Sequence, residues 1–159
     1  MKIEDELRVK KFSSEWQRAT VNILFTASWL TLILEKRASK KNITLQQFNA
    51  LRILRGQYPD PCTNNLLRSR VIGNMPDVSR LVDRLVKKEL VSRTKGEQDK
   101  RSVDLLITQK GLDLLQEIED DMMLTDFLPH RITVQEAIQL SDILDKLRGT
   151  AEDSAVVFG

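Results

Sequence analysis

The sequence predicts a mainly α-helical protein that contains one small β-hairpin. Apolar residues recur at helical spacing over most of the 159 residues. Only residues 90–108 break this pattern, with two short runs on either side of a charged segment. A chain of this length suits one domain with a single sizeable core. With six glycines and four prolines, the composition excludes collagen-like and low-complexity proteins.

The residue inventory argues against an enzyme. Cys62 is the only cysteine, so the chain can form no internal disulfide and no cysteine-based zinc site. His130 is the only histidine, which removes most zinc, non-haem iron and Ser-His-Asp arrangements. We therefore expect no catalytic residue, no metal and no cofactor. Aromatic residues make up 5% of the chain, which also disfavours a stacking platform for single-stranded nucleic acid.

The amino-terminal residues MKIEDELRVKKF carry mixed charge and no apolar segment, so we expect no signal peptide. The most apolar stretch, residues 21–34, contains several polar residues. It is also shorter than the roughly 18 residues that a membrane-spanning helix needs. The stretch therefore predicts a buried helix, and the expectation is a soluble cytoplasmic protein.

The net charge is only +2, but it is unevenly distributed along the chain. Residues 1–62 contain 11 basic and 6 acidic residues, and residues 63–111 also contain 11 basic and 6 acidic residues. Residues 112–159 contain 3 basic and 11 acidic residues. A basic middle with an acidic end is typical of a protein that presents one face to a polyanion. The alternative is that solvated charged faces segregate without a function.

Three helices are expected in the first half of the chain. The first spans residues 13–39 and is apolar nearly all round at its centre, which indicates partners on most sides and hence a subunit interface. The second begins at Thr44, where Gln47 completes a capping box, and ends at Gly56. A proline-containing turn and a third helix over residues 64–72 follow.

The fourth helix, residues 75–88, is the clearest amphipathic element. Asn74 is expected to cap it, Pro76 to lie in its first turn, and Asp77 to place a favourable charge near its N-terminus. One face carries apolar residues at the spacing i, i+3, i+4, i+7, i+8. The other face is polar and largely basic, and consists of Ser79, Arg80, Asp83, Arg84, Lys87 and Lys88.

The hairpin consists of residues 90–94 and 102–108, joined by the charged tip 95–101. Two helices, a basic amphipathic helix and a charged hairpin follow one another in the order of a winged helix-turn-helix. A helix with a basic face fits the major groove, where its first residues reach base edges and its long side chains reach phosphates. A cationic hairpin tip can reach the adjacent minor groove.

Two further helices are expected after the hairpin. Thr108 is placed to cap the first of them, residues 109–124. Thr133 and Glu136 form a capping box for the second, which ends near Arg148. The residues after it lack periodicity and predict a loose tail.

Two stretches resemble the MarR family of bacterial transcriptional regulators. The segment VSRLVDRLVKKELV, residues 78–91, is similar to the family's recognition helix and its exit. Arg93, the run Asp99-Lys-Arg101 and the downstream Ile107-Thr108-x-x-Gly111 resemble its wing signature, with isoleucine at a position that is usually leucine. The resemblance in helix order covers nearly the whole chain, and the specific motif covers about residues 74–111.

The resemblance implies a winged helix-turn-helix domain at residues 43–108. It also implies a helical dimerisation region formed by residues 1–42 and 109–150, with residues 151–159 as the tail. In this arrangement the first and the last two helices of two chains interlock into a homodimer. The homodimer would bind double-stranded DNA at a pseudo-palindromic operator and act as a ligand-responsive repressor.

The resemblance further implies a pocket for a small aromatic or phenolic effector between the two regions. Phe12, Trp16 and Arg52 are candidate lining residues. The alternative is that these are ordinary core aromatics and a solvated arginine.

The expected DNA contacts lie in the fourth helix and the hairpin: Pro76, Asp77, Ser79, Arg80, Arg84, Lys87, Arg93, Lys95, Lys100 and Arg101. In the family's arrangement Asp99 braces Arg101. The alternative is that these two residues form a surface ion pair, which would contribute little to stability.

The chain departs from the family at Asp77, where serine or threonine is usual. Its carboxylate would repel phosphate, but it can also accept a hydrogen bond from cytosine N4 or cap the helix. Cys62 lies in an unusual loop with Pro59 and Pro61 and is a candidate redox sensor, although no cation adjoins it in sequence to activate the thiol. The alternative function is a winged-helix module that binds proteins and has lost its affinity for DNA.

Overall fold

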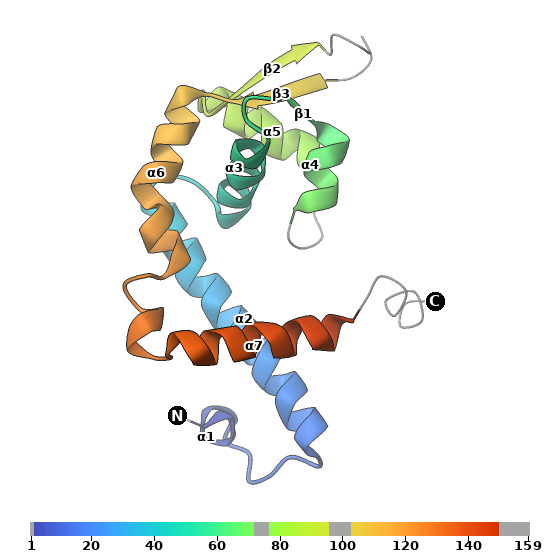
Figure 1. The fold of residues 1–159 in the computed structure, drawn as a ribbon, viewed down its shortest axis with the longest axis vertical. Coiled ribbons are helices and arrows are strands. Elements are labelled where there is room, and N and C mark those ends of the chain that lie inside the picture. The colour runs from blue at the N-terminus through green and yellow to red at the C-terminus, as the bar shows by residue number, and fades with distance from the viewer. Residues whose placement is uncertain (1, 72–76, 96–102, 150–159) are drawn as a thin grey trace. The chain divides into compact units, whose positions relative to one another are not determined.

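The computed structural model describes residues 2–71, 77–95 and 103–149 (Figure 1). The chain forms two compact units, Met1–Ile118 and Glu119–Gly159. The elements of the first unit are α1 (Ile3–Leu7), α2 (Glu15–Ser39), α3 (Leu45–Gln57), β1 (Cys62–Thr63), α4 (Asn64–Arg70), α5 (Val78–Lys87), β2 (Val91–Lys95), β3 (Val103–Ile107) and most of α6 (Gln109–Met123). The second unit contains the end of α6, the 3-10 helix η1 (Leu128–His130) and α7 (Val134–Arg148). The predicted mainly α-helical fold with a β-hairpin is confirmed.

The helix starts follow the capping residues that the sequence predicts. Thr44 Oγ1 accepts a hydrogen bond from the amide of Gln47 at 3.1 Å, and the Gln47 side chain accepts one from the amide of Thr44, which completes the capping box of α3. Thr133 and Glu136 make the same reciprocal pair at the start of α7. Each pair satisfies two of the backbone N–H groups that a helix start leaves without a partner.

The core of the first unit lies where α3, α4 and α5 pack around a small antiparallel sheet. The strand order is β1-β3-β2, so β3 is central, and Leu105 pairs with Arg93 on one side and with Cys62 on the other. The largest side chains that are fully removed from solvent in this unit are Leu51, Leu54, Leu67, Leu85, Leu105, Ile107, Leu115 and Ile118. Burial of such leucine and isoleucine side chains contributes about 1.5–3 kcal/mol each.

The start of α6 is fixed against the hairpin by Thr108 and Gly111. The Thr108 hydroxyl donates to the carbonyl of Glu89 at 2.7 Å and accepts from the amide of Gly111 at 3.1 Å. A Cβ at Gly111 would lie 2.5 Å from the carbonyl oxygen of Leu90 and 2.7 Å from Cγ1 of Ile107. Only glycine permits this close approach of helix and hairpin, which gives the Thr-x-x-Gly spacing its physical reason.

Each unit carries a helix with large apolar side chains exposed to solvent. In α2 the exposed fractions are 84% for Trp16, 66% for Leu24 and 63% for Leu32. In α7 both Ile143 and Leu147 are 64% exposed. Exposed apolar surface of this extent on two helices is typical of a surface that another chain covers.

Several expected boundaries were wrong. Helix α3 continues through Gly56 and ends at Gln57, because Gly56 adopts helical geometry and not the left-handed conformation that ends a helix. Helix α4 ends at Arg70, and Val71 is extended. Helix α5 begins at Val78, because Asp77 is its N-cap. Asn74 and Pro76 therefore precede the helix, and both lie outside the described residues.

Two elements had no clear signal in the sequence. Helix α1 is a single short turn in a stretch of mixed charge. Strand β1 has only two residues and forms because the chain after Pro61 reaches the free edge of β3. No helix among the described ranges is long and apolar enough to cross a membrane.

Candidate nucleic-acid interface

Helix α5 presents a polar face whose side chains are all exposed: Ser79, Arg80, Asp83, Arg84 and Lys87. Its opposite face is buried against the core through Val78, Leu81, Val82 and Leu85. The sequence predicted this division from the helical spacing of the apolar residues. Three of the five exposed side chains are permanently cationic at neutral pH, so the face can meet phosphates.

Asp77 caps α5 and holds Arg80. Its Oδ1 accepts a hydrogen bond from the amide of Arg80 at 3.0 Å, and its Oδ2 lies 2.8 Å from Nε of the same residue. Of the three roles considered for this carboxylate, capping is the one that the geometry shows. The Arg80 side chain is still 79% exposed, so the ion pair orients it at the surface and does not bury it.

The hairpin is joined to α5 by an ion pair between Arg93 of β2 and Asp83 of α5. Residues 92–95 of β2 are all exposed, and Lys95 is the last described residue before the tip. Arg93 and Lys95 therefore project from the same strand, two residues apart, on one face of the hairpin. Pro76, Asp99, Lys100 and Arg101, which were also expected at this interface, lie outside the described residues.

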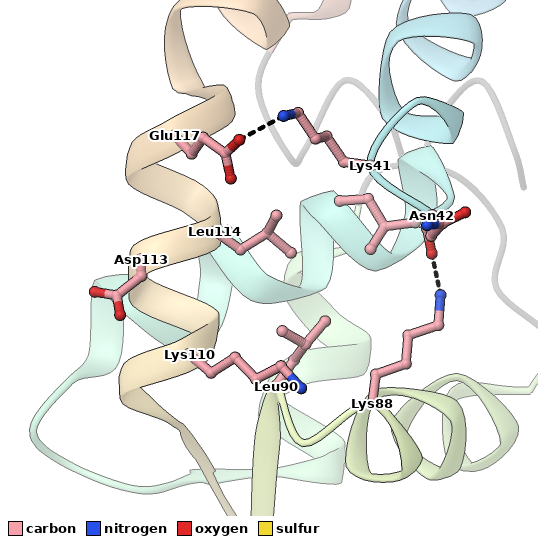
Figure 2. Close-up of a pocket in the computed structure, with 9 residues that line it drawn as sticks. Lys41, Asn42, Lys88, Leu90, Lys110, Asp113, Leu114 and Glu117 are labelled. Atoms are coloured by element: carbon pink, nitrogen blue, oxygen red, sulfur yellow. Dashed lines mark hydrogen bonds and ion pairs between the residues drawn. The ribbon is translucent and has the colours of Figure 1, made fainter.

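A concave site lies beside the first half of α6, where residues of the α2–α3 junction and of the segment between α5 and β2 approach it. This lysine groove has a volume of about 680 Å³ and is lined by Lys41, Asn42, Ile43, Lys88, Leu90, Lys110, Asp113, Leu114 and Glu117 (Figure 2). Lys41 binds the Glu117 carboxylate, and Lys88 donates to the carbonyl of Asn42. Lys110 lies 2.8 Å from Oε2 of Glu89 and lowers the pKa of that carboxyl.

The three candidate effector residues are not brought into one site. Trp16 is 84% exposed on α2, and Phe12 is half-buried before that helix. Arg52 lies 5.8 Å from the centre of the Phe48 ring. It lines a different hollow, of about 320 Å³ between α3 and α4, with Asn49, Ile53, Arg55, Gly56 and Arg70. The lysines of the groove and Arg70 were missed because residues distant in the chain meet there, which periodicity along the chain does not reveal.

Cys62, in the edge strand β1, is fully buried. Burial raises the pKa of its thiol, and the nearby charge of Arg70 only partly opposes this effect. A buried thiol with a raised pKa is chemically inert. Among the residues that the structure describes, no three His, Cys, Asp or Glu side chains are grouped so as to hold a metal ion.

The MarR family model matches residues 43–103 of the chain. A MarR transcription factor from Planctomyces limnophilus is 30% identical, with a TM-score of 0.64 over 84% of this chain and 99% of that one. The Staphylococcus aureus MepR–DNA complex is 23% identical, with a TM-score of 0.69 over 86% and 97% of the two chains. Bordetella bronchiseptica BpsR, whose DNA binding 6-hydroxynicotinic acid regulates, is 18% identical, with a TM-score of 0.68 over 80% and 91%. A comparison with curated proteins finds no match.

The mainly helical fold with a small three-stranded antiparallel sheet agrees with these matches. The Planctomyces relative is covered almost from end to end at 30% identity. The chain belongs to the MarR family of winged-helix, DNA-binding transcription regulators.

Proposed function

We propose that the protein is a homodimeric repressor that binds a pseudo-palindromic double-stranded operator and releases it when a small effector binds. The observation that carries this proposal is the exposed face of α5, where Arg80, Arg84 and Lys87 project beside the cationic strand β2. The width of an α-helix fits the major groove, and the hairpin beside it is placed for an adjacent contact with the backbone or the minor groove. We assign the DNA contacts to the residues of α5 and the hairpin that the sequence predicts for this role.

We infer the dimer from the apolar side chains that α2 and α7 expose to solvent. Side chains such as Leu24, Leu32 and Ile143 are each more than 60% exposed, which is costly for a chain that remains alone in water. We assign dimerisation to residues 1–42 and 109–150 and DNA binding to residues 43–108. A two-fold dimer would then place two copies of α5 on two half-sites of the same duplex.

The effector site that we propose is the lysine groove. Its apolar lining consists of Ile43, Leu90 and Leu114, and its cation for a ligand is Lys88, which donates to the uncharged oxygens of Asn42 and Gln47. An apolar floor with cationic groups around it suits a small aromatic acid, which has one apolar ring and one negative charge. Regulation of BpsR by 6-hydroxynicotinic acid is a precedent for this class of effector in a protein of the same fold.

Salt-dependent binding to a fluorescent duplex tests the function. Affinity that falls steeply with salt, and falls less steeply in the Arg84→Ala variant, supports DNA binding through α5. A protein module without DNA affinity would show no binding at low salt. Light scattering on the same sample tests the dimer, because a mass near the 18.3 kDa of one chain at micromolar concentration would contradict it.

If the lysine groove is the effector site, an aromatic acid such as 4-hydroxybenzoate should weaken duplex binding in the parent protein and not in Leu114→Trp, which fills the groove.

A further inference from the structure

Three arginines meet in the hollow between α3 and α4, here called the arginine hollow. It has a volume of about 320 Å³ and is lined by Asn49, Arg52, Ile53, Arg55, Gly56 and Arg70. No carboxylate is among the described residues that line it, and Arg52 of α3 and Arg70 of α4 bring positive charge to it from two helices. Like charges that are held close together on two helices favour an anion between them.

The lysine groove shows the contrast. There Lys41 is paired with Glu117 and Lys110 with Glu89, so two of the three lysines that line the groove are matched by carboxylates of the same chain. The arginine hollow has no such acidic rim among the described residues that line it. Its guanidinium groups are planar and permanently charged, and they present paired N–H donors that match the oxygens of a phosphate.

Gly56 lines the arginine hollow without a side chain. It lies inside α3 with ordinary helical geometry, so no backbone conformation requires glycine there. A Cβ at this position would meet nothing within 4 Å, so packing does not require glycine either. Glycine in a helix destabilises the protein relative to alanine. The residue therefore lowers stability and leaves space beside Arg52 and Arg55.

The arginine hollow faces away from the recognition helix. Asn49, Arg52, Ile53 and Gly56 follow the spacing i, i+3, i+4, i+7 and so share one face of α3. The opposite face of the same helix, which includes Leu51 and Leu54, is buried in the core against which α5 packs. A duplex bound to the exposed face of α5 would lie on the far side of that core. A small molecule is therefore the occupant that the test below distinguishes from the DNA backbone.

We propose that the arginine hollow binds a small molecule through a phosphate or pyrophosphate group. The volume of the hollow matches the lower end of small-molecule sites, which is about 300 Å³. Arg52 and Arg70 hold the phosphate oxygens from α3 and α4, and the space beside Gly56 admits the rest of the ligand. This site is distinct from the lysine groove and from the DNA-binding face of α5.

Isothermal titration of the full-length protein with pyrophosphate, at constant ionic strength and without DNA, tests the proposal. We expect one pyrophosphate per chain, and a loss of affinity of at least about tenfold in Arg52→Gln and in Arg70→Gln. Gly56→Gln retains every arginine but fills the hollow, and it should also abolish binding. Arg68→Gln is the matched control, because Arg68 is an exposed arginine of α4 that does not line the hollow. It should bind as the parent does, and circular dichroism confirms the fold of each variant.

Three results would overturn the proposal. The first is the absence of pyrophosphate binding to the parent protein at millimolar concentration. The second is an equal loss of affinity in Arg68→Gln and Arg52→Gln, which would mean diffuse attraction to a basic surface. The third comes from a parallel titration with a short duplex. If Arg52→Gln and Arg70→Gln weaken duplex binding but the parent does not bind pyrophosphate, the occupant is the DNA backbone.

Discussion

Arg93 of β2 forms an ion pair with Asp83 of α5, so the hairpin and helix α5 are joined by their side chains at the protein surface. Both side chains are about half exposed, at 41% and 55%. A surface pair of this kind contributes little to stability, typically below about 1 kcal/mol. Its effect lies in holding an arginine of the hairpin toward the helix and away from solvent.

Replacing Asp83 should therefore change DNA binding more than stability. In Asp83→Asn the Arg93 side chain is released and gains access to a phosphate. We expect the slope of log K against log salt to steepen by about 1, while the free energy of unfolding changes by less than about 1 kcal/mol. The double variant with Arg93→Gln should lose the steepening. A slope that steepens equally in both backgrounds would show that Arg93 does not reach the DNA.

The exposed residues of α5 should divide into two groups. Arg84 and Lys87 lie in the last turns of the helix, so they should contact phosphates. Arg84→Ala and Lys87→Ala should each weaken binding equally for all sequences and reduce the salt slope by about 1.

Ser79 and Arg80 lie in the first turn, where Asp77 holds Arg80 at 2.8 Å. Their alanine variants should change the preference among bases, as measured by competition between duplexes that differ at single positions. Equal loss of sequence preference in all four variants would contradict the division.

The wing should contribute through Arg101. This prediction rests on the spacing of Asp99, Arg101 and Thr108 in the sequence, because the tip lies outside the described residues. A guanidinium is weakly hydrated and enters a narrow minor groove more readily than an ammonium. Arg101→Ala should cost about 1–3 kcal/mol of DNA affinity in anisotropy titrations, and Arg101→Lys should restore only part of it. Asp99→Ala should also weaken binding, and tighter binding by this variant would refute the bracing role.

The fold was predictable from local patterns to a large extent. The capping pairs at Thr44 and Thr133 and the two faces of α5 depend on residues within one or two helical turns, so the sequence contains their signals. The start of α5 was misplaced because Asn74 and Asp77 are both good capping residues, and only the folded chain selects between them.

The features that could not be predicted depend on contacts between distant segments. The ion pair of Arg93 with Asp83 forms only because the hairpin lies against α5. From the sequence, Arg93 was expected only as a DNA contact. Strand β1 has only two residues, too few for a pattern along the chain, and pairs with the edge of β3. The arginine hollow joins Arg52, which was a candidate effector residue, to Arg70 across two helices, and Arg70 has no signal that would distinguish it from a solvated arginine.

Cys62 should not act as a redox sensor. Its side chain is inaccessible, and burial raises the pKa of the thiol, so little thiolate exists near neutral pH. We expect iodoacetamide to label the native protein far more slowly than the protein in concentrated guanidinium chloride. Hydrogen peroxide should leave duplex affinity unchanged. Rapid labelling of the native protein, with loss of DNA binding, would restore the redox hypothesis.

Selection of bound duplexes from a random pool tests the central claim most directly, because it examines DNA binding and dimer symmetry together. A two-fold dimer imposes its symmetry on the site that it prefers. The enriched sequences should therefore contain inverted half-sites whose centres are about one helical turn apart, roughly 10–10.5 bp. Enrichment of a single asymmetric motif, or no enrichment at low salt, would contradict the account of a dimeric operator-binding regulator.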